Sequence, residues 1–215
     1  PEESGTLTSL KDFISSLNCI SFGINTGNGW AIRFRKEKKL KNAEAYKLKI
    51  CKGYAEILAS GSAGFFYGAQ TLIQVLGCSF NVALIAGPNR IAEDDAYDKR
   101  WIPEMEIEDS PAYKVRSFMV DAGRAPFTMP LLKRIVRIMS HLKMNTLHFH
   151  AFDDQLCGLK FNRLPLGSEN PYAISMADLS ELVKYCEKYH VNLMPEIESW
   201  GHVQSVIYHY PELYG

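Results

Sequence analysis

The chain has 215 residues, and its 24 Lys and Arg residues balance its 24 Asp and Glu residues, so the formal net charge is zero. This balance argues against an electrostatic surface for nucleic acid or for an anionic membrane. The hydrophobic share of 47% and the charged share of 22% are ordinary for a globular protein. No run approaches the roughly 20 apolar residues that a membrane-spanning helix needs. Five widely spaced cysteines without a CxxC motif argue against a disulfide scaffold or a zinc knuckle.

The first hundred residues have the pattern of short strands and one helix. Apolar and β-branched runs predict strands at residues 18–24, 30–35, 45–50 and 54–58, and an Asn- and Gly-rich turn predicts a hairpin of the first two. Helical spacing of apolar residues predicts a helix over 61–76, which Gly77 is suited to end. Gly61, Gly64 and Gly68 fit no phosphate-binding motif, so they predict close packing of this helix on a sheet. The basic stretch 33–41 indicates a solvated strand end and turn rather than an anion site.

The pattern changes near Ser110–Pro111, where we place a domain boundary. Residues 102–111 predict an extended connector, and strands then alternate strictly with helices. The strands are predicted at 115–121, 146–152 and 191–197, with helices that begin after Thr128 and after Ser175, the latter in a near capping box with Asp178. Such alternation is typical of a parallel sheet. We therefore expect an α/β protein, with a small α+β domain at 1–110 and, at 111–215, an incomplete (β/α)8 TIM-type barrel of about three strands.

Polar side chains collect where these three strands end, which is where parallel α/β folds carry their chemistry. They are Asp121 and Arg124 at the end of the first strand, His148, His150, Asp153 and Asp154 on and after the second, and Glu196, Glu198 and His202 at the end of the third, beside Trp200. A guanidinium can donate two parallel hydrogen bonds to neighbouring sugar hydroxyls. A carboxylate can fix the tautomer of an imidazole that tunes a catalytic acid. Trp200 either offers a flat face to a sugar ring or belongs to the core. This set favours carbohydrate hydrolysis.

Zinc-dependent hydrolysis is an alternative at the same strand ends. His148 and His150 are two residues apart, so they share one face of the second strand. Together with His202 and a carboxylate, they form a set that is able to ligate zinc. An HxH pair is a weak signal, and two hydrogen-bonded histidines inside a barrel are the preferred interpretation.

Four segments of the sequence occur in a familiar order and spacing. They read AGFFYGAQTLIQ at 63–74, RSFMVDAGR at 116–124, KMNTLHFHAFDD at 143–154 and PEIESWGH at 195–202. The first is similar to the helix of the small α/β domain that precedes a catalytic barrel, and the others are similar to the first three strand motifs of that barrel. In combination they resemble glycoside hydrolase family 20, the β-N-acetylhexosaminidases, from about Glu44 onward.

The resemblance implies retaining hydrolysis that releases terminal N-acetylhexosamine, in which the substrate's own 2-acetamido oxygen attacks the anomeric carbon. It implies that Arg124 binds hydroxyls of the terminal sugar, and that Asp153 is a carboxylate paired with the histidine His202. His150 would support the substrate site, together with Trp200 and Glu198. The family uses no metal and no nucleotide cofactor, and the implied partner is an N-acetylhexosamine-containing glycan. A secreted, periplasmic or lysosomal location is implied, although the first residues do not form a signal peptide.

Departures from the family pattern set further expectations. The usual Pro before Gly-His is Trp200 here, and an Asp position is Glu198. The family's catalytic acid and its neighbouring aspartate lie on a fourth-strand Asp-Glu motif, which this sequence does not contain. Glu196 and Glu198 match the third-strand motif instead. Because a complete barrel needs about 250 residues, we expect the chain to be part of a longer protein and to have negligible glycosidase activity alone.

Two further interpretations stay open at this point. In the first, the chain is a non-catalytic homologue that binds glycans without cleaving them. In the other, the N-terminal domain has a separate glycan- or partner-binding role.

Overall fold

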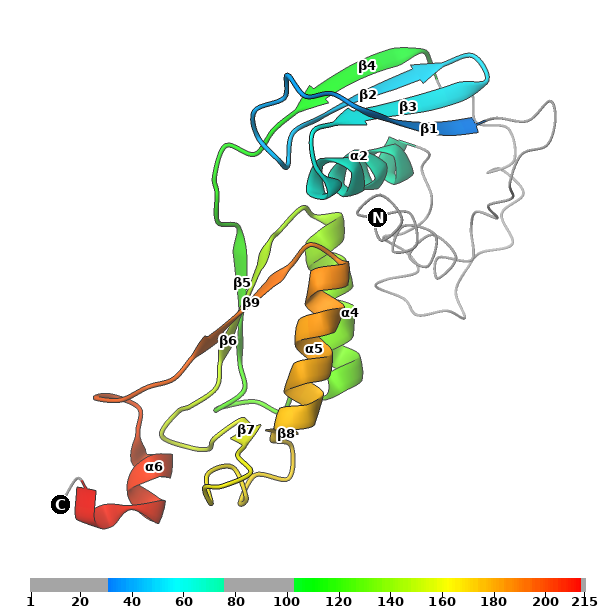
Figure 1. The fold of residues 1–215 in the computed structure, drawn as a ribbon. Helices are drawn as coiled ribbons and strands as arrows, with labels where there is room; N and C mark the ends of the chain where they lie inside the picture. The colour runs from blue at the N-terminus through cyan, green and yellow to red at the C-terminus, as the bar shows by residue number, and fades with distance from the viewer. Residues whose placement is uncertain (1–30, 76–102, 214–215) are drawn as a thin grey trace, which may run out of the picture. The chain divides into compact units, whose positions relative to one another are not determined.

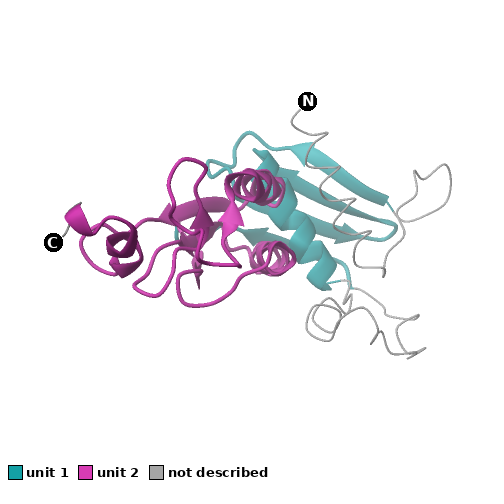
Figure 2. Ribbon diagram, turned by 90° about the horizontal axis from the view of Figure 1, so that it is seen from below, with its two compact units in different colours: residues 1–114 teal, residues 115–215 magenta. Residues whose placement is uncertain are grey.

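The computed structural model describes residues 31–75 and 103–213. The strand predicted at 18–24, its hairpin, and the helix end at Gly77 lie outside these residues. The chain divides into two compact units, residues 1–114 and 115–215 (Figure 2). Each unit combines strands with helices, which confirms the predicted α/β class. None of the helices within the described residues has the length and apolar character that crossing a bilayer requires.

The first unit contains a four-stranded sheet with one helix on it (Figure 1). The strands are β1 (Ala31–Lys36), β2 (Tyr46–Cys51), β3 (Tyr54–Ala59) and β4 (Met105–Asp109), in the order β1-β3-β2-β4. β1 runs parallel to β3, and the other pairs are antiparallel. The helix α2 (Ser62–Val75) packs on β2 and β3. The strands predicted at 30–35, 45–50 and 54–58 and the helix predicted at 61–76 are therefore confirmed, apart from the helix end.

Small residues let α2 approach the sheet closely. A Cβ at Gly64 would lie 2.4 Å from the carbonyl oxygen of Ala45, and one at Gly68 would lie 2.6 Å from Cγ2 of Ile57. Both separations are shorter than real Cβ contacts, so only glycine fits there. Phe66 and Ile57, which are fully buried, belong to the core of this unit. The prediction of close helix–sheet packing is confirmed.

Opposite charges pair between neighbouring strands of this sheet. Arg35 pairs with Glu56 at 3.4 Å, Lys49 with Glu106 at 3.3 Å and Lys47 with Glu108 at 2.8 Å. The prediction of an extended connector over 102–111 was wrong in part, because 105–109 form the strand β4. Its exposed Glu106 and Glu108 give it the polar composition of a linker. Their pairing with lysines of β2 shows that they belong to the surface of a sheet.

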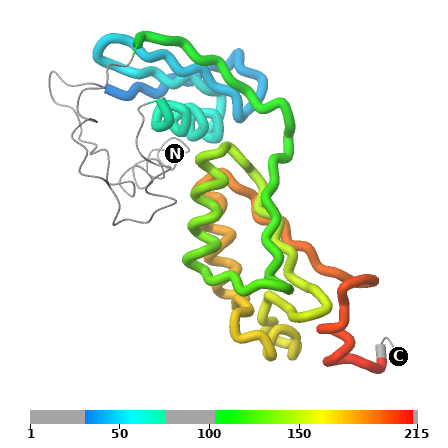
Figure 3. The backbone as a smooth tube through the Cα atoms, turned by 180° about the vertical axis from the view of Figure 1, so that it is seen from behind, coloured from blue at the N-terminus to red at the C-terminus, as the bar shows by residue number. Residues whose placement is uncertain are grey.

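The second unit contains a parallel sheet in the order β5-β6-β9. Its strands are β5 (Ser117–Asp121), β6 (Thr146–His150) and β9 (Asn192–Glu196). The helices α4 (Met129–His141) and α5 (Met176–Lys188) lie side by side along one face of the sheet, as Figures 1 and 3 both show. Both caps are confirmed: Thr128 accepts a hydrogen bond from the Leu131 N–H, and Ser175 and Asp178 form a complete capping box. Leu147 and Phe149 of the central strand are fully buried.

Four short elements of this unit were not predicted. They are β7 (Leu159–Lys160) and β8 (Ile174–Ser175), which pair in parallel, the helix α6 (Gln204–His209) and the 3-10 helix η2 (Pro211–Leu213). All four lie toward the carboxyl ends of β5, β6 and β9 (Figure 1). They therefore build the surroundings of the strand ends, where the predicted site residues are found.

Candidate functional site

The register of the parallel sheet places three ionisable side chains in one row. Asp121 of β5 is aligned with His150 of β6, and His150 is aligned with Glu196 of β9. Aligned residues on neighbouring strands point to the same face of a sheet. The row forms the last layer of the sheet before the strand-end loops. The side chains of the site that come from these loops lie next to this layer.

Arg124 is held by the turn that follows β5. Its backbone N–H donates to Asp121 Oδ1 at 3.0 Å, and its Nη1 donates to Asp121 Oδ2 at 2.8 Å. The neighbouring Gly123 allows this turn to approach the loop after β6, since a Cβ there would lie 2.6 Å from Cβ of Asp153. The turn therefore brings the guanidinium of Arg124 to Asp153.

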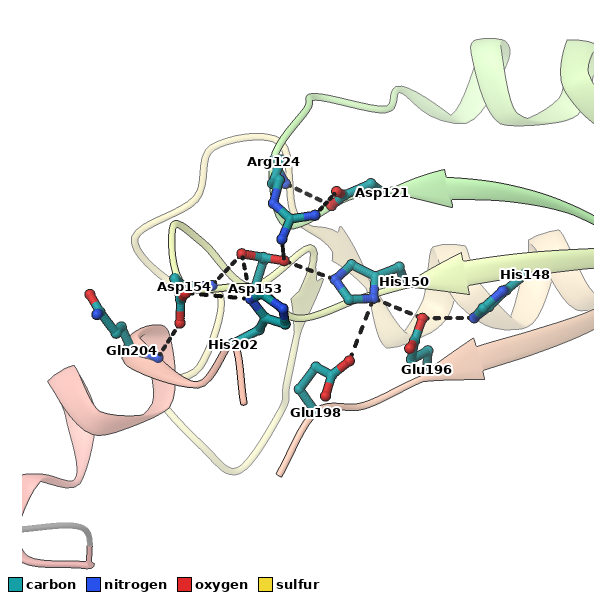
Figure 4. Close-up of polar contacts among 10 residues, drawn as sticks. All are labelled: Asp121, Arg124, His148, His150, Asp153, Asp154, Glu196, Glu198, His202 and Gln204. Atoms are coloured by element: carbon teal, nitrogen blue, oxygen red, sulfur yellow. Dashed lines mark hydrogen bonds and ion pairs between the residues drawn. The ribbon is translucent and has the colours of Figure 1, made fainter. Parts of the chain in front are cut away.

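The carboxylate of Asp153 is the centre of the cluster (Figure 4). Its Oδ2 lies 2.6 Å from Arg124 Nη2 and 3.0 Å from His150 Nε2, and its Oδ1 accepts the Asp154 N–H at 2.6 Å. The residue is fully buried. Burial alone would raise the pKa of Asp153, but the hydrogen bonds from His150 and the Asp154 N–H, with the charge of Arg124, lower the pKa below its ordinary value. Asp153 is therefore an ionised carboxylate.

His150 lies between two carboxylates from different strand ends. Its Nε2 faces Asp153, and its Nδ1 lies 2.8 Å from Glu196 Oε2, which is also 2.7 Å from His148 Nε2. Burial opposes the charge on His150, but the hydrogen bonds with Asp153 and Glu196 outweigh it and raise the pKa of His150. The hydrogen bond between His150 and Glu196 lowers the pKa of Glu196, although the partial burial of Glu196 opposes this shift.

His202 approaches the cluster from the loop between β9 and α6. Its Nδ1 lies 3.4 Å from Asp154 Oδ2 and 3.7 Å from Asp153 Oδ1, and its ring is half-exposed. The residue has φ of +53°, a left-handed conformation that is uncommon outside glycine. Asp154 also accepts the Gln204 N–H at 3.3 Å, which ties this loop to the loop after β6. The loop therefore presents an imidazole beside two adjacent carboxylates.

The structure brings together most of the residues predicted from the sequence. Arg124, Asp153, His150 and His202 meet in one cluster, and Glu198 Oε1 lies 4.0 Å from His150 Nδ1. The hydrogen-bonded partner of Asp153 is His150, whereas His202 stands at a longer distance. Trp200 is 97% exposed, which excludes the core interpretation.

Asp121, Asp154 and Glu196 were noted at the strand ends, but none of them was assigned a role in the site from the sequence. Asp121 and Glu196 end the two strands that flank β6, and both are in register with His150, so the strand alignment is the signal that identifies them. Asp154 follows a predicted site residue directly, and its role depends on a loop that the sequence pattern does not define.

The zinc set considered from the sequence does not assemble. Three groups of ligand atoms lie within 4.8 Å of one another: Asp121, His150 and Asp153; His150, Glu196 and Glu198; and Asp153, Asp154 and His202. Across residues 31–75 and 103–213, no such group includes His148 or joins two histidines. Arg124 and His150 already pair with carboxylates of these groups.

Known protein families match both units. Residues 113–215 match the glycosyl hydrolase family 20 catalytic domain, and residues 7–110 match domain 2 of glycosyl hydrolase family 20. A β-hexosaminidase of Porphyromonas gingivalis is 26% identical over 79% of this chain and 22% of its own length. A β-N-acetylhexosaminidase of Cellulomonas fimi is 28% identical over 79% of this chain and 33% of its own length. The chain thus spans a third or less of these relatives.

Solved structures agree with the sequence matches. The GH20 β-N-acetylhexosaminidase of Streptomyces coelicolor A3(2) superposes with a TM-score of 0.76 at 27% identity, over 96% of this chain and 42% of that protein. Two adjacent domain matches from one family, in the order found here, account for residues 7–110 and 113–215. The chain belongs to glycosyl hydrolase family 20.

Proposed function

We propose that the chain supplies the sugar-positioning part of a glycosidase that releases terminal N-acetylhexosamine with retention of configuration. The observation that carries this proposal is the meeting of Arg124, Asp153 and His202, which come from three different strand-end loops, at 2.6 Å and 3.7 Å. The names of the relatives, β-hexosaminidase and β-N-acetylhexosaminidase, support the substrate class.

Arg124 is the group that binds hydroxyls of the terminal sugar. A guanidinium has five N–H donors. Asp121 pairs with Nη1 and Asp153 pairs with Nη2, so each carboxylate occupies one of the two N–H donors on its nitrogen. The side chain is 46% exposed, so its other donors are open to a ligand. The hydrogen bond to Asp121, the charge of Asp153 and the charge of Asp154 raise the pKa of Arg124. A fixed, charged and partly exposed guanidinium suits two neighbouring hydroxyls.

His202 and the carboxylates beside it form the polar wall of the sugar site. The imidazole is half-exposed, and its Nδ1 lies within 4 Å of carboxylate oxygens of both Asp153 and Asp154. The family chemistry assigns the attack on the anomeric carbon to the acetamido oxygen of the substrate. The bond to the leaving group then breaks as a general acid protonates the glycosidic oxygen. That acid belongs to an Asp-Glu motif, and this sequence has no Asp-Glu dipeptide.

The test separates binding from cleavage on the 215-residue chain. N-acetylglucosamine is titrated into the labelled chain and followed by NMR, with Arg124→Ala as the test variant and the exposed Arg163→Ala as its matched control. We expect Arg124→Ala to weaken binding about tenfold or more, because it removes charge-assisted hydrogen bonds worth about 1.5–3 kcal/mol. Arg163→Ala should bind like the wild type. We also expect no measurable release of a chromogenic aglycone from an N-acetylglucosaminide.

Two results would count against this proposal. In one, N-acetylglucosamine perturbs no signals of Arg124, Asp153 or His202. In the other, both arginine variants weaken binding equally.

A further inference from the structure

His150 has a partner on each of its two ring nitrogens, and both partners are carboxylates. Nε2 lies 3.0 Å from Asp153 Oδ2, and Nδ1 lies 2.8 Å from Glu196 Oε2. A neutral imidazole has one N–H donor and one lone pair. In the neutral ring, one lone pair would therefore face a carboxylate oxygen at hydrogen-bond distance. Only a doubly protonated ring donates to both partners.

A proton on Asp153 is the other way to avoid two facing lone pairs, but it costs the charge that Arg124 requires. A hydroxyl at Oδ2 would donate to a neutral Nε2, yet the same oxygen lies 2.6 Å from Arg124 Nη2, which would then lose its anionic partner. A hydroxyl at Oδ1 would point its hydrogen at the Asp154 N–H, which lies 2.6 Å away. On the other side, Glu196 Oε2 lies between the rings of His148 and His150. The proton therefore belongs on the imidazole.

The charges around His150 agree with a cation at this position. Four carboxylates face or surround it from three strand ends: Asp121, Asp153, Glu196 and Glu198. Arg124 contacts the same Asp153 oxygen as His150, and His148 contacts Glu196. His150 itself is 6% exposed, so water cannot replace these partners easily. A buried cation is tolerated only where such carboxylates and hydrogen bonds compensate it.

We propose that His150 is a positioning residue: as an imidazolium it joins Asp153 to Glu196 and fixes the Asp153 carboxylate in the orientation that holds Arg124. The ring has no donor left for a sugar, so it acts through Asp153 and Arg124 and does not contact substrate. The inference rests on the proposed function in one respect, namely that Arg124 binds the sugar. The bridge itself is a property of this chain alone.

The first test reads the protonation of His150 directly. Long-range ¹H–¹⁵N NMR spectra of the labelled 215-residue chain distinguish a doubly protonated imidazole from either neutral tautomer. The His150 signals are assigned by their loss in His150→Gln. If that variant does not fold, substitution of the other five histidines in turn assigns the signals by exclusion. We expect His150 to carry two ring protons at pH 7, and a neutral tautomer at that pH would overturn the proposal.

The second test uses paired variants around Glu196. In Glu196→Gln, the pH at which His150 loses its second proton should fall, because one of its two carboxylates is gone. His148→Gln is the matched control, since His148 contacts the same Glu196 oxygen without contacting Asp153. His148→Gln should leave the pKa of the Asp153 carboxyl, followed by ¹³C NMR, as in the wild type. His150→Gln should raise that pKa. Unchanged titration of His150 in Glu196→Gln would contradict the bridge.

No measurement in either test involves a sugar. A failure of the bridge therefore leaves the proposed function standing, and an absence of sugar binding leaves the bridge standing.

Discussion

Asp153 receives only hydrogen-bond donors at both of its carboxylate oxygens. Arg124 and His150 face Oδ2, and the Asp154 N–H faces Oδ1. An asparagine at this position would have to turn its amide N–H₂ toward one of these donors in either orientation. Because the side chain is fully buried, water cannot restore the missing acceptor. The site is therefore specific for a carboxylate and not merely for a small polar side chain.

We accordingly expect Asp153→Asn to lower the free energy of unfolding by about 2 kcal/mol, the scale for an unsatisfied buried partner of a charged group. Asp154→Asn is the control, since Asp154 is 38% exposed in its side chain and an amide oxygen can still accept the Gln204 N–H. Its effect should stay within about 0.5 kcal/mol. Urea unfolding of both variants measures the difference, and equal losses would show that Asp153 has no special requirement for charge.

The sequence predicted which residues reach the strand ends but not how they pair. Arg124, Asp153 and His202 each lie in the loop that follows a strand, so the parallel topology places all three at one edge of the sheet. The choice of His150 as the hydrogen-bonded partner of Asp153 depends on side-chain directions and on the loop after β6. Both are set by tertiary packing, which periodicity does not report. Glu196 was within reach of prediction, because it ends a strand aligned with His150.

At the scale of elements, the helices α4 and α5 of the second unit begin with caps of different quality. The capping box of α5 has reciprocal bonds: the Asp178 N–H donates to Ser175 Oγ at 3.1 Å, and the Ser175 N–H donates to Asp178 Oδ2 at 3.3 Å. At α4, Thr128 Oγ1 accepts a single bond from Leu131 at 3.4 Å. An uncapped first turn leaves N–H groups without intrahelical partners.

We expect Ser175→Ala to lower the free energy of unfolding by about 1–2 kcal/mol and Thr128→Ala by about 0.5 kcal/mol. The reason is that the first substitution removes the Ser175 hydroxyl, which accepts the Asp178 N–H at 3.1 Å and donates to Asp178 Oδ2 at 2.7 Å, while the second removes one long bond. Urea unfolding of the two variants under identical conditions compares them. A larger loss for Thr128→Ala would mean that cap geometry does not govern the stability of these helices.

Elements with strong periodicity were predictable, and short or polar ones were not. The helices α4 and α5 and the strand β6 have clear apolar patterns, and all three occur close to the predicted bounds. β4 was mistaken for a connector, because its alternating glutamates are paired only across the sheet. β7 and β8 have two residues each, which is too short for any period of two to be recognised.

At the scale of the whole molecule, the second unit leaves apolar side chains of its outer strands exposed. Phe118 and Met119 of β5 and Met194 of β9 are between 44% and 52% exposed, while Leu147 and Phe149 of the central strand are buried. β5 and β9 each have one sheet neighbour within the described residues, whereas β6 has two. Three parallel strands cannot close into a barrel, and the outer strands of this sheet accordingly leave apolar surface uncovered.

The charge states of four buried or clustered groups give the chain a stability that depends on pH. The lowered pKa values of Asp153 and Glu196 contribute stability above about pH 4, which is lost as the pH falls through the folded values. The raised pKa of His150 contributes stability below about pH 6.5, which is lost as the pH rises through its folded value. His141 acts in the opposite sense, because burial lowers its pKa to about 4.

We expect these opposing contributions to give a maximum of stability near pH 6.5. Between about pH 6.5 and pH 4 the unfolded chain takes up a proton at His141 that the folded chain excludes, so stability falls as the pH decreases. We expect this limb to amount to about 2 kcal/mol, allowing for solvent screening. In His141→Leu, urea unfolding across this range should show the limb flattened, while the decrease above pH 6.5 that His150 causes should remain as an internal control. An unchanged acid limb in this variant would mean that His141 takes up its proton equally in the folded and the unfolded chain.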